Sequence, residues 1–309
     1  MNFKKLRNEC QDIWDEKVGI RDIVKAAYDV YNRPSLKYSH SNPIKAVESK
    51  FDKNVSSRRG NYCEKVVHTI VANDNRFELL KECVSENGKQ SKCGNEIDSP
   101  LMLLQEVDAD IAKACSTDKK VNMKDMSEMS GIMDHLYLKA IEMTKYNIPE
   151  SDMVHLVQDL DIGFKVKETE DIYLYEVKYT GSFGGDVAWE HLRKYLRAYV
   201  DYVYKNKPSR DKIHTAMLLT RRDNPDSFRY LPRGENGFIT FEDFCLEHDI
   251  NISKKQMDEL FFDITQINDD EVTEILDMFT ILIQKDEELL KRPFADVVKA
   301  FSNEFSMDI

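Results

Sequence analysis

The stretch from residue 161 to residue 180 reads DIGFKVKETEDIYLYEVKYT, and it constrains the fold more than any other part of the chain. Two apolar, alternating segments flank the polar, turn-like KETED, which is the pattern of a β-hairpin. The second segment carries Glu176 and Lys178 within an otherwise apolar run. Side chains at i and i+2 of a strand point to the same face, so the two charges share a face and need partners there.

A second carboxylate comes beside this pair when the hairpin closes. Asp161 opens the first strand, fifteen residues before Glu176, and pairing around KETED brings the two side by side. Two carboxylates a few ångström apart repel each other unless one takes a proton or a cation lies between them. Oxygen ligands of this kind suit Mg²⁺ or Mn²⁺. Asp159, one strand repeat away on the same face, is the alternative ligand.

These residue types indicate phosphodiester hydrolysis. A divalent ion polarises a phosphoryl oxygen and acidifies bound water, and Lys178 is placed to orient that water and to stabilise developing negative charge. The simpler alternative is a structural ion pair between Glu176 and Lys178 on a water-facing edge strand. Aromatic surroundings argue against an edge, because seven of the fourteen tyrosines fall between residues 173 and 204.

The spacing from Asp161 to Glu176 and Lys178 resembles the active-site signature of the PD-(D/E)XK nuclease superfamily, which includes many restriction endonucleases. In that family an acidic residue begins one core strand and a (D/E)-x-K triplet lies on the next. Leu160 precedes Asp161 here, where proline is common in the superfamily. The resemblance covers roughly residues 58–245 and implies Asp161 and Glu176 as metal ligands.

The resemblance also implies partners on two helices. A glutamate of the preceding helix often joins the metal site, and GNYCEKVVH offers Glu64 for that role. A polar residue of the following helix often completes the site, and WEHLRKYL offers His191, Arg193 or Lys194. Glu64 pairing with a surface base, and His191 or Lys194 lying outside the site, are the alternatives.

Hydrophobic periodicity predicts an α/β fold with a mixed β-sheet flanked by helices, which the resemblance makes restriction-endonuclease-like. We expect helices over 1–35, over 100–146 and from about 187 to 205, and a further helix through Tyr62–Val71 whose start is marked by Gly60 and the two serines before it. We expect an exposed loop at 85–98, a strand at 212–220, a strand running into a helix at 237–244, and helices over 253–309.

Three regions follow from this pattern. Residues 1–57 form an N-terminal helical region, and residues 58–250 form the nuclease core, with a large helical insertion at about 85–150. Residues 251–309 form an acidic helical C-terminal region, in which 6 Lys+Arg oppose 14 Asp+Glu, a net of −8.

The formal charge of −12 argues against a protein that coats nucleic acid non-specifically, so any such surface must be local. Arg58 and Arg59 in SSRRGN, Arg221 and Arg222 in an arginine- and aromatic-rich loop, and Lys194 are the candidates for contact with phosphates. A solvated loop with local ion pairs to Asp223 and Asp226 is the alternative for the segment with Arg221 and Arg222.

Compartment is inferred from what the sequence lacks. We find no apolar run that could cross a bilayer, no signal-peptide core at the N-terminus, and no CxxC pair among the six cysteines. A cytoplasmic protein with free thiols is the expectation.

The residues and the resemblance together predict a Mg²⁺-dependent endodeoxyribonuclease, with Mn²⁺ as a possible substitute. A restriction-type enzyme of anti-phage defence is the main expectation, with double-stranded DNA as substrate, a homodimer as assembly and a methyltransferase as companion. One alternative is the nuclease subunit of a helicase-partnered defence system of the Hachiman type, whose RGxxxE helix resembles RGNYCE. Another is a nuclease-like subunit that binds nucleic acid or assembles without cleaving.

Overall fold

The computed structural model describes residues 2–32, 42–80, 93–114, 126–179, 185–220 and 231–307, without the side chains of 93–97, 114, 156–160 and 185–188. The chain divides into two compact units: one comprises Cys63–Lys254, and the other comprises Asn2–Tyr62 and Lys255–Ile309. The two ends of the chain, which the sequence presents as separate regions, therefore belong to the same unit. No helix in the described ranges has the length and apolar character needed to cross a bilayer.

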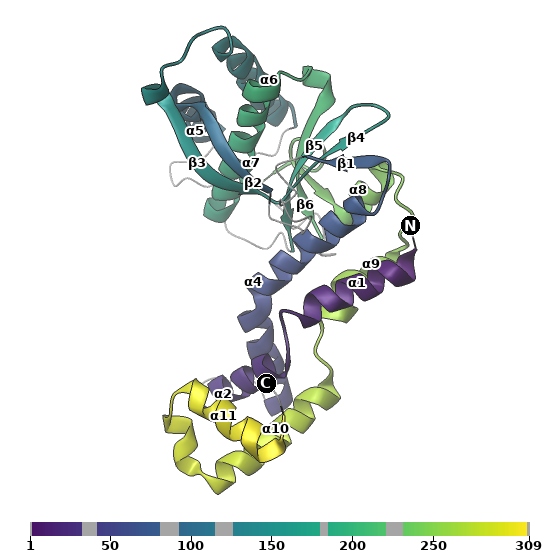
Figure 1. Cartoon of the computed structure of the whole chain (residues 1–309), viewed down its shortest axis with the longest axis vertical. Helices are drawn as coiled ribbons and strands as arrows, with labels where there is room; N and C mark the ends of the chain where they lie inside the picture. The colour runs from purple at the N-terminus through teal and green to yellow at the C-terminus, as the bar shows by residue number, and fades with distance from the viewer. Residues whose placement is uncertain are drawn as a thin grey trace. The chain divides into compact units, whose positions relative to one another are not determined.

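In its described residues, the unit that contains both ends has only helices and 3₁₀ turns as regular elements. Its elements are α1 (Phe3–Asp15), α2 (Ile20–Asn32), most of α4 (Pro43–Ala72), α9 (Lys254–Phe261), α10 (Asp269–Lys285), α11 (Phe294–Phe305) and the short 3₁₀ turns η5 (Asp263–Thr265) and η6 (Glu287–Lys291). Helices α2, α10 and α11 pack together (Figure 1). Near α9, the Tyr62 hydroxyl donates to the Leu260 carbonyl at 2.6 Å, and the Tyr62 ring meets the edge of Trp14.

Two helix boundaries differ from the expectation. The single helix expected over 1–35 is two helices, because the backbone N–H of Gly19 donates to the Asp22 carboxylate, 3.1 Å away, in the break between them. Helix α4 begins at Pro43, a residue suited to a first turn, and passes through Gly60 without interruption. The Ser56 hydroxyl donates back to the Lys53 carbonyl and caps no helix.

The other unit is built on a five-stranded mixed sheet. Its strands are β1 (Phe77–Leu79), β4 (Ile162–Val166), β5 (Ile172–Lys178), β6 (Ile213–Leu219) and β7 (Phe238–Thr240), hydrogen-bonded in that order. The β4–β5 hairpin is confirmed, antiparallel with Ile162 opposite Tyr175. Strands β5, β6 and β7 run parallel. The strand expected at 212–220 is confirmed as β6, and the strand running into a helix at 237–244 is confirmed as β7 followed by α8 (Phe241–Glu247). Because β5 has a neighbour on each side, the edge-strand alternative for Glu176 and Lys178 is wrong.

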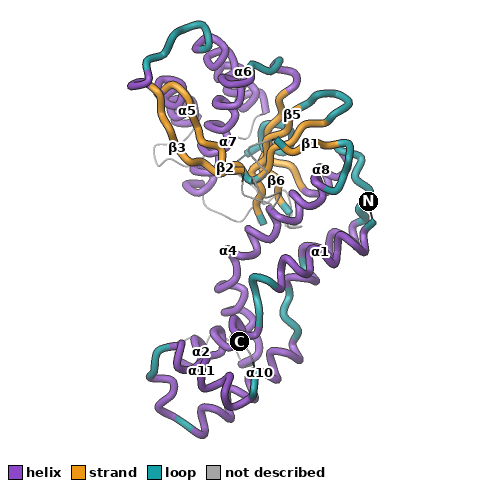
Figure 2. The backbone as a smooth tube through the Cα atoms, viewed as in Figure 1, coloured by secondary structure: helices purple, strands orange, loops and turns teal. Residues whose placement is uncertain are grey.

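A second, two-stranded sheet holds β2 (Cys93–Pro100) and β3 (Met153–Leu160), antiparallel along their full lengths. The loop expected over 85–98 is therefore wrong from residue 93 onward, while residues 85–92 lie outside the described ranges. The helical insertion is present as α5 (Leu101–Ala114) and α6 (Met126–Met143). Both pack against α7 (Gly185–Asn206), which connects β5 to β6 (Figure 2).

The two faces of β5 point into different cores. Ile172 and Leu174 belong to the hydrophobic cluster formed with α5, α6 and α7. Tyr173 and Tyr175 face the other way and pack around His248, just after α8 (Phe241–Glu247). By the two-residue period of a strand, Glu176 and Lys178 share the α7 side with Ile172 and Leu174.

A buried carboxylate joins the two-stranded sheet to α7, and its removal should destabilise the fold. Asp201 is 3% exposed, and its Oδ1 accepts from the Asp98 backbone N–H (2.9 Å) and the Ser99 hydroxyl (2.7 Å). Asp201→Ala removes the acceptor of the buried Ser99 hydroxyl and of the half-buried Asp98 N–H, so we expect a loss of about 2–3 kcal/mol in the free energy of unfolding by urea. Asp134→Ala, at an exposed ion pair with Arg210, is the control and should cost less than about 1 kcal/mol. Equal losses in the two variants would contradict this role for Asp201.

Candidate active site

The candidate site lies where β5 faces α7. Glu176 is fully buried and Lys178 is 17% exposed by side chain. Lys178 Nζ lies 2.7 Å from Glu176 Oε1, so the two charges of the strand are partners. The pair is not isolated, because both side chains also contact residues of other elements.

Asp161 adds the second carboxylate, as the hairpin pattern predicted. It directly precedes β4, and the hairpin register brings it beside the end of β5. Asp161 Oδ2 accepts from the Val177 backbone N–H at 2.8 Å and from Lys178 Nζ at 3.1 Å. The backbone hydrogen bond fixes the carboxylate against the strand that carries Glu176, so Lys178 Nζ lies within 3.1 Å of oxygens from both acids.

Helix α7 supplies two further basic groups. Lys194 Nζ lies 3.2 Å from Glu176 Oε1 and 3.5 Å from Asp161 Oδ1. His191 Nδ1 lies 3.2 Å from Glu176 Oε1. Residues three apart on a helix are surface neighbours, so His191 and Lys194 reach the site from the same side of α7. Both residues were candidates from the sequence, and both lie at the carboxylate pair.

The charges of the cluster shift one another's pKa values. Burial, and then the charge of Glu176, raise the pKa of Asp161 above its ordinary value despite the nearby lysines. Burial would also raise the pKa of Glu176, but contacts with His191, Lys178 and Lys194 outweigh it and lower that pKa. Burial opposes the charge on Lys178, yet the two carboxylates raise its pKa, so Lys178 stays protonated at neutral pH. The pair therefore takes up its first proton at Asp161.

One oxygen of the cluster has no hydrogen-bond partner among the described residues. Glu176 Oε2 is buried and accepts no hydrogen bond from any described residue. An unsatisfied buried carboxylate oxygen is costly, and in folded proteins such an oxygen commonly contacts an ion or a water. Two carboxylates, one with an open oxygen, form a donor set that fits Mg²⁺ or Mn²⁺. Asp161 and Glu176 are the residues that would hold such an ion.

Among the described residues, Glu64 does not form a metal-binding group with Asp161 and Glu176. It lies half-buried on α4, and no group of three or more His, Cys, Asp or Glu side chains arranged for a metal occurs in the described ranges. The side chain of Asp159, the alternative ligand, lies outside the part of the chain that the structure describes, and its backbone belongs to β3 of the two-stranded sheet.

The basic candidates outside the cluster have different positions. Arg58 contacts the Lys17 carbonyl (2.7 Å) and the Asp22 carboxylate (2.6 Å) within the helical unit. Arg59 is 7% exposed and donates to the Asp52 carboxylate and the Thr265 carbonyl. Arg59 was expected to contact phosphate, but its side chain is buried and its hydrogen bonds hold parts of the helical unit together. Arg221 and Arg222 lie outside the described residues.

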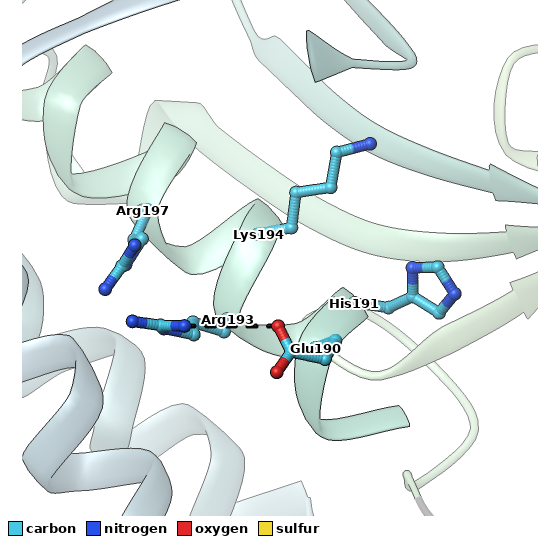
Figure 3. A pocket seen from close by; sticks show the side chains of 5 residues that line it. All are labelled: Glu190, His191, Arg193, Lys194 and Arg197. Atoms are coloured by element: carbon cyan, nitrogen blue, oxygen red, sulfur yellow. Dashed lines mark ion pairs between the residues drawn. The ribbon is translucent and has the colours of Figure 1, made fainter. Parts of the chain in front are cut away.

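A pocket of 280 Å³ opens beside the cluster on α7, lined by Glu190, His191, Arg193, Lys194 and Arg197. His191 and Lys194 extend from the helix to one side, and Arg193 and Arg197 to the other (Figure 3). Sequence reasoning missed Asp108, the α5 residue that pairs with both arginines. Its position within a helical insertion gave no local signal of this contact.

Comparison of the chain with models of protein families, with curated proteins and with solved structures finds no match in any of the three. Inferences about function therefore rest on the geometry above.

Divalent metal should stabilise the protein through Glu176. A ligand at 100 times its Kd adds about 2.7 kcal/mol to stability, so Mn²⁺ should raise the Tm of the parent by several degrees. Glu176→Gln should remove most of this shift, measured against the variant's own metal-free Tm. Asp171→Asn, which alters a carboxylate paired with Lys212 at the start of β5, should keep it. An unchanged Mn²⁺ shift in Glu176→Gln would rule out the assigned ligand.

The affinity for Mn²⁺ should depend on pH through Asp161. Its pKa is raised in the folded protein, so a proton competes with the metal below that pKa. Affinity should therefore increase as the pH rises from about 4 and level off once Asp161 is ionised. Calorimetric titration over that range measures the effect, and Asp161→Asn should bind more weakly with a flatter pH profile. A flat profile in the parent would contradict the competition.

Proposed function

We propose that the protein is a Mg²⁺-dependent endonuclease that hydrolyses DNA phosphodiester bonds. One observation supports the proposal above the others: Asp161 and Glu176 converge on Lys178 Nζ, at 3.1 and 2.7 Å, and Glu176 Oε2 is buried without a hydrogen-bond partner among the described residues. A cluster with a purely structural role would be expected to satisfy each buried oxygen.

The layout of the site also supports a PD-(D/E)XK nuclease with a restriction-endonuclease-like fold. An acidic residue stands at the start of β4, and the Glu-x-Lys triplet lies on its antiparallel neighbour β5. The chain then continues through α7, which brings Lys194 to the acids, into the parallel strand β6. This sequence of elements agrees with what the signature implies.

Each residue of the cluster has a chemical role in this proposal. A divalent ion held by Asp161 and Glu176 would polarise the phosphoryl oxygen and acidify water bound to it. Lys178 is protonated, so it donates a hydrogen bond to the attacking water and stabilises negative charge that develops on the phosphate. Lys194 offers a second positive charge on the side facing α7. His191 holds the position of Glu176 through its contact with Oε1.

Within this function we propose a restriction-type enzyme of anti-phage defence, acting in the cytoplasm on double-stranded DNA as a homodimer. Two copies of the site allow both strands to be cut. Digestion of plasmid DNA with Mg²⁺ tests this subtype, because a restriction enzyme produces discrete fragments. Cleavage that requires an added helicase would instead assign the protein to a partnered defence system.

Replacing Lys178 separates catalysis from binding. Lys178→Ala removes the ammonium at both carboxylates, so the rate of plasmid cleavage should fall by at least about 100-fold while DNA binding and folding persist. Lys165→Ala is the control, since Lys165 pairs with Glu170 across the same hairpin, away from the carboxylate pair. Single-turnover rates and circular dichroism of the two variants provide the comparison.

Two outcomes would overturn this catalytic assignment. The first is a Lys178→Ala variant that cuts as fast as the parent. The second is a parent protein that binds DNA but cuts no substrate with Mg²⁺ or Mn²⁺.

A further inference from the structure

We propose that the pocket on α7 binds a phosphate group of the nucleic-acid strand, next to the phosphate that is cut, through Arg193 and Arg197. This inference rests on the proposed nuclease function and deepens it by naming the part of the substrate that the pocket recognises.

The lining of the pocket suits an anion. Of its five residues, Arg193, Lys194 and Arg197 are cationic, His191 can become so, and Glu190 alone is acidic. Its volume of 280 Å³ lies just below the roughly 300–1,000 Å³ of pockets that enclose drug-sized ligands. A phosphate with its sugar is a closer match to this size than a whole cofactor.

The two arginines share the carboxylate of Asp108. Arg193 donates through Nε and Nη2 to the two oxygens of Asp108, at 2.9 and 3.0 Å. Arg197 Nη2 lies 3.1 and 2.9 Å from the same two oxygens. One carboxylate thus holds two guanidinium groups, and Glu190 Oε2 also lies 4.0 Å from Arg193 Nη1. Guanidinium groups that are already oriented lose little freedom when they bind a phosphate.

Arg197 has a donor without a partner, and Arg193 has a further contact that orients it. Arg197 Nε is buried and has no hydrogen-bond partner among the residues that the structure describes. The guanidinium of Arg193 lies 5.1 Å from the centre of the Trp189 ring, which orients its plane. An oxygen acceptor in the pocket would offset the cost of the unpaired N–H.

The pocket is continuous with the candidate active site. His191 and Lys194 line it and also contact Glu176, while Arg193 and Arg197 extend to the other side of α7 (Figure 3). The six steps along the helix from His191 to Arg197 rise about 9 Å along its axis. In this proposal, a strand whose scissile phosphate lies at Glu176 would pass His191 and Lys194, and a neighbouring phosphate would enter the pocket that the arginines also line.

The alternative is that Arg193, Asp108 and Arg197 only tie α5 to α7. Binding measurements distinguish the two roles. Fluorescence anisotropy of labelled duplex DNA, in EDTA to prevent cleavage and over a series of KCl concentrations, reports both affinity and salt dependence. Far-UV circular dichroism and Tm report whether a variant has lost the stabilising contact between α5 and α7.

We expect Arg193→Gln and Arg197→Gln each to weaken DNA binding by about tenfold and to lower the slope of log K against log salt by about 1. Arg210→Gln is the matched control, because Arg210 pairs with Asp134 in the same unit and does not line the pocket. It should bind as the parent does. Asp108→Asn removes a negative charge behind the pocket, so it should bind DNA at least as tightly as the parent even if its Tm falls.

Parent-like affinity and salt slope in both arginine variants would overturn the inference. So would Asp108→Asn weakening DNA binding as much as the arginine variants do. Failure of the proposed function looks different, because it appears as Lys178→Ala cutting at the parent's rate whatever the arginine variants bind. A parent that binds no nucleic acid would overturn both.

Discussion

The burial of two carboxylates beside one another is the constraint on which the rest of the α/β unit depends. Asp161 and Glu176 lie in an otherwise apolar region, where each unpaired ion would cost several kcal/mol. Lys178 and Lys194 supply the compensating charges, and the Val177 N–H fixes Asp161. The compensation is incomplete, because one oxygen of Glu176 is left without a partner in the described part of the chain. A buried oxygen without a partner lowers the stability of the fold, and such local costs are common at functional sites.

Helix α7 is the element that links this site to its surroundings. Its apolar residues, such as Leu192 and Leu196, complete the core with α5 and α6, so the helical insertion supports the helix that delivers Lys194. On another side it presents Arg193 and Arg197, held from α5 by Asp108. The insertion thus contributes to this region through packing and through one carboxylate, which contacts both arginines of the proposed phosphate pocket.

The basic residues show why composition alone does not identify a binding surface. Arg59 and Arg193 both occur near other arginines and both lie on helices. Arg59 is buried against Asp52 and Thr265 in the helical unit, whereas Arg193 lines a pocket beside the carboxylate pair. Chain neighbours decide neither outcome, because exposure is set by what packs over each side chain. The serines and glycine before Glu64 likewise lie within a continuous helix, where a helix start was expected.

Local pattern determined the hairpin, the strand after α7, and the meeting of Asp161, Glu176 and Lys178, since strand alternation and a short turn leave few other pairings. The same pattern placed His191 and Lys194 on the following helix. Tertiary structure alone decided that both chain ends form one unit, that residues 93–100 pair with β3 in a separate sheet, and that Asp108 holds two arginines. These contacts join residues tens to hundreds of positions apart, and no local periodicity encodes which distant partner a side chain will meet.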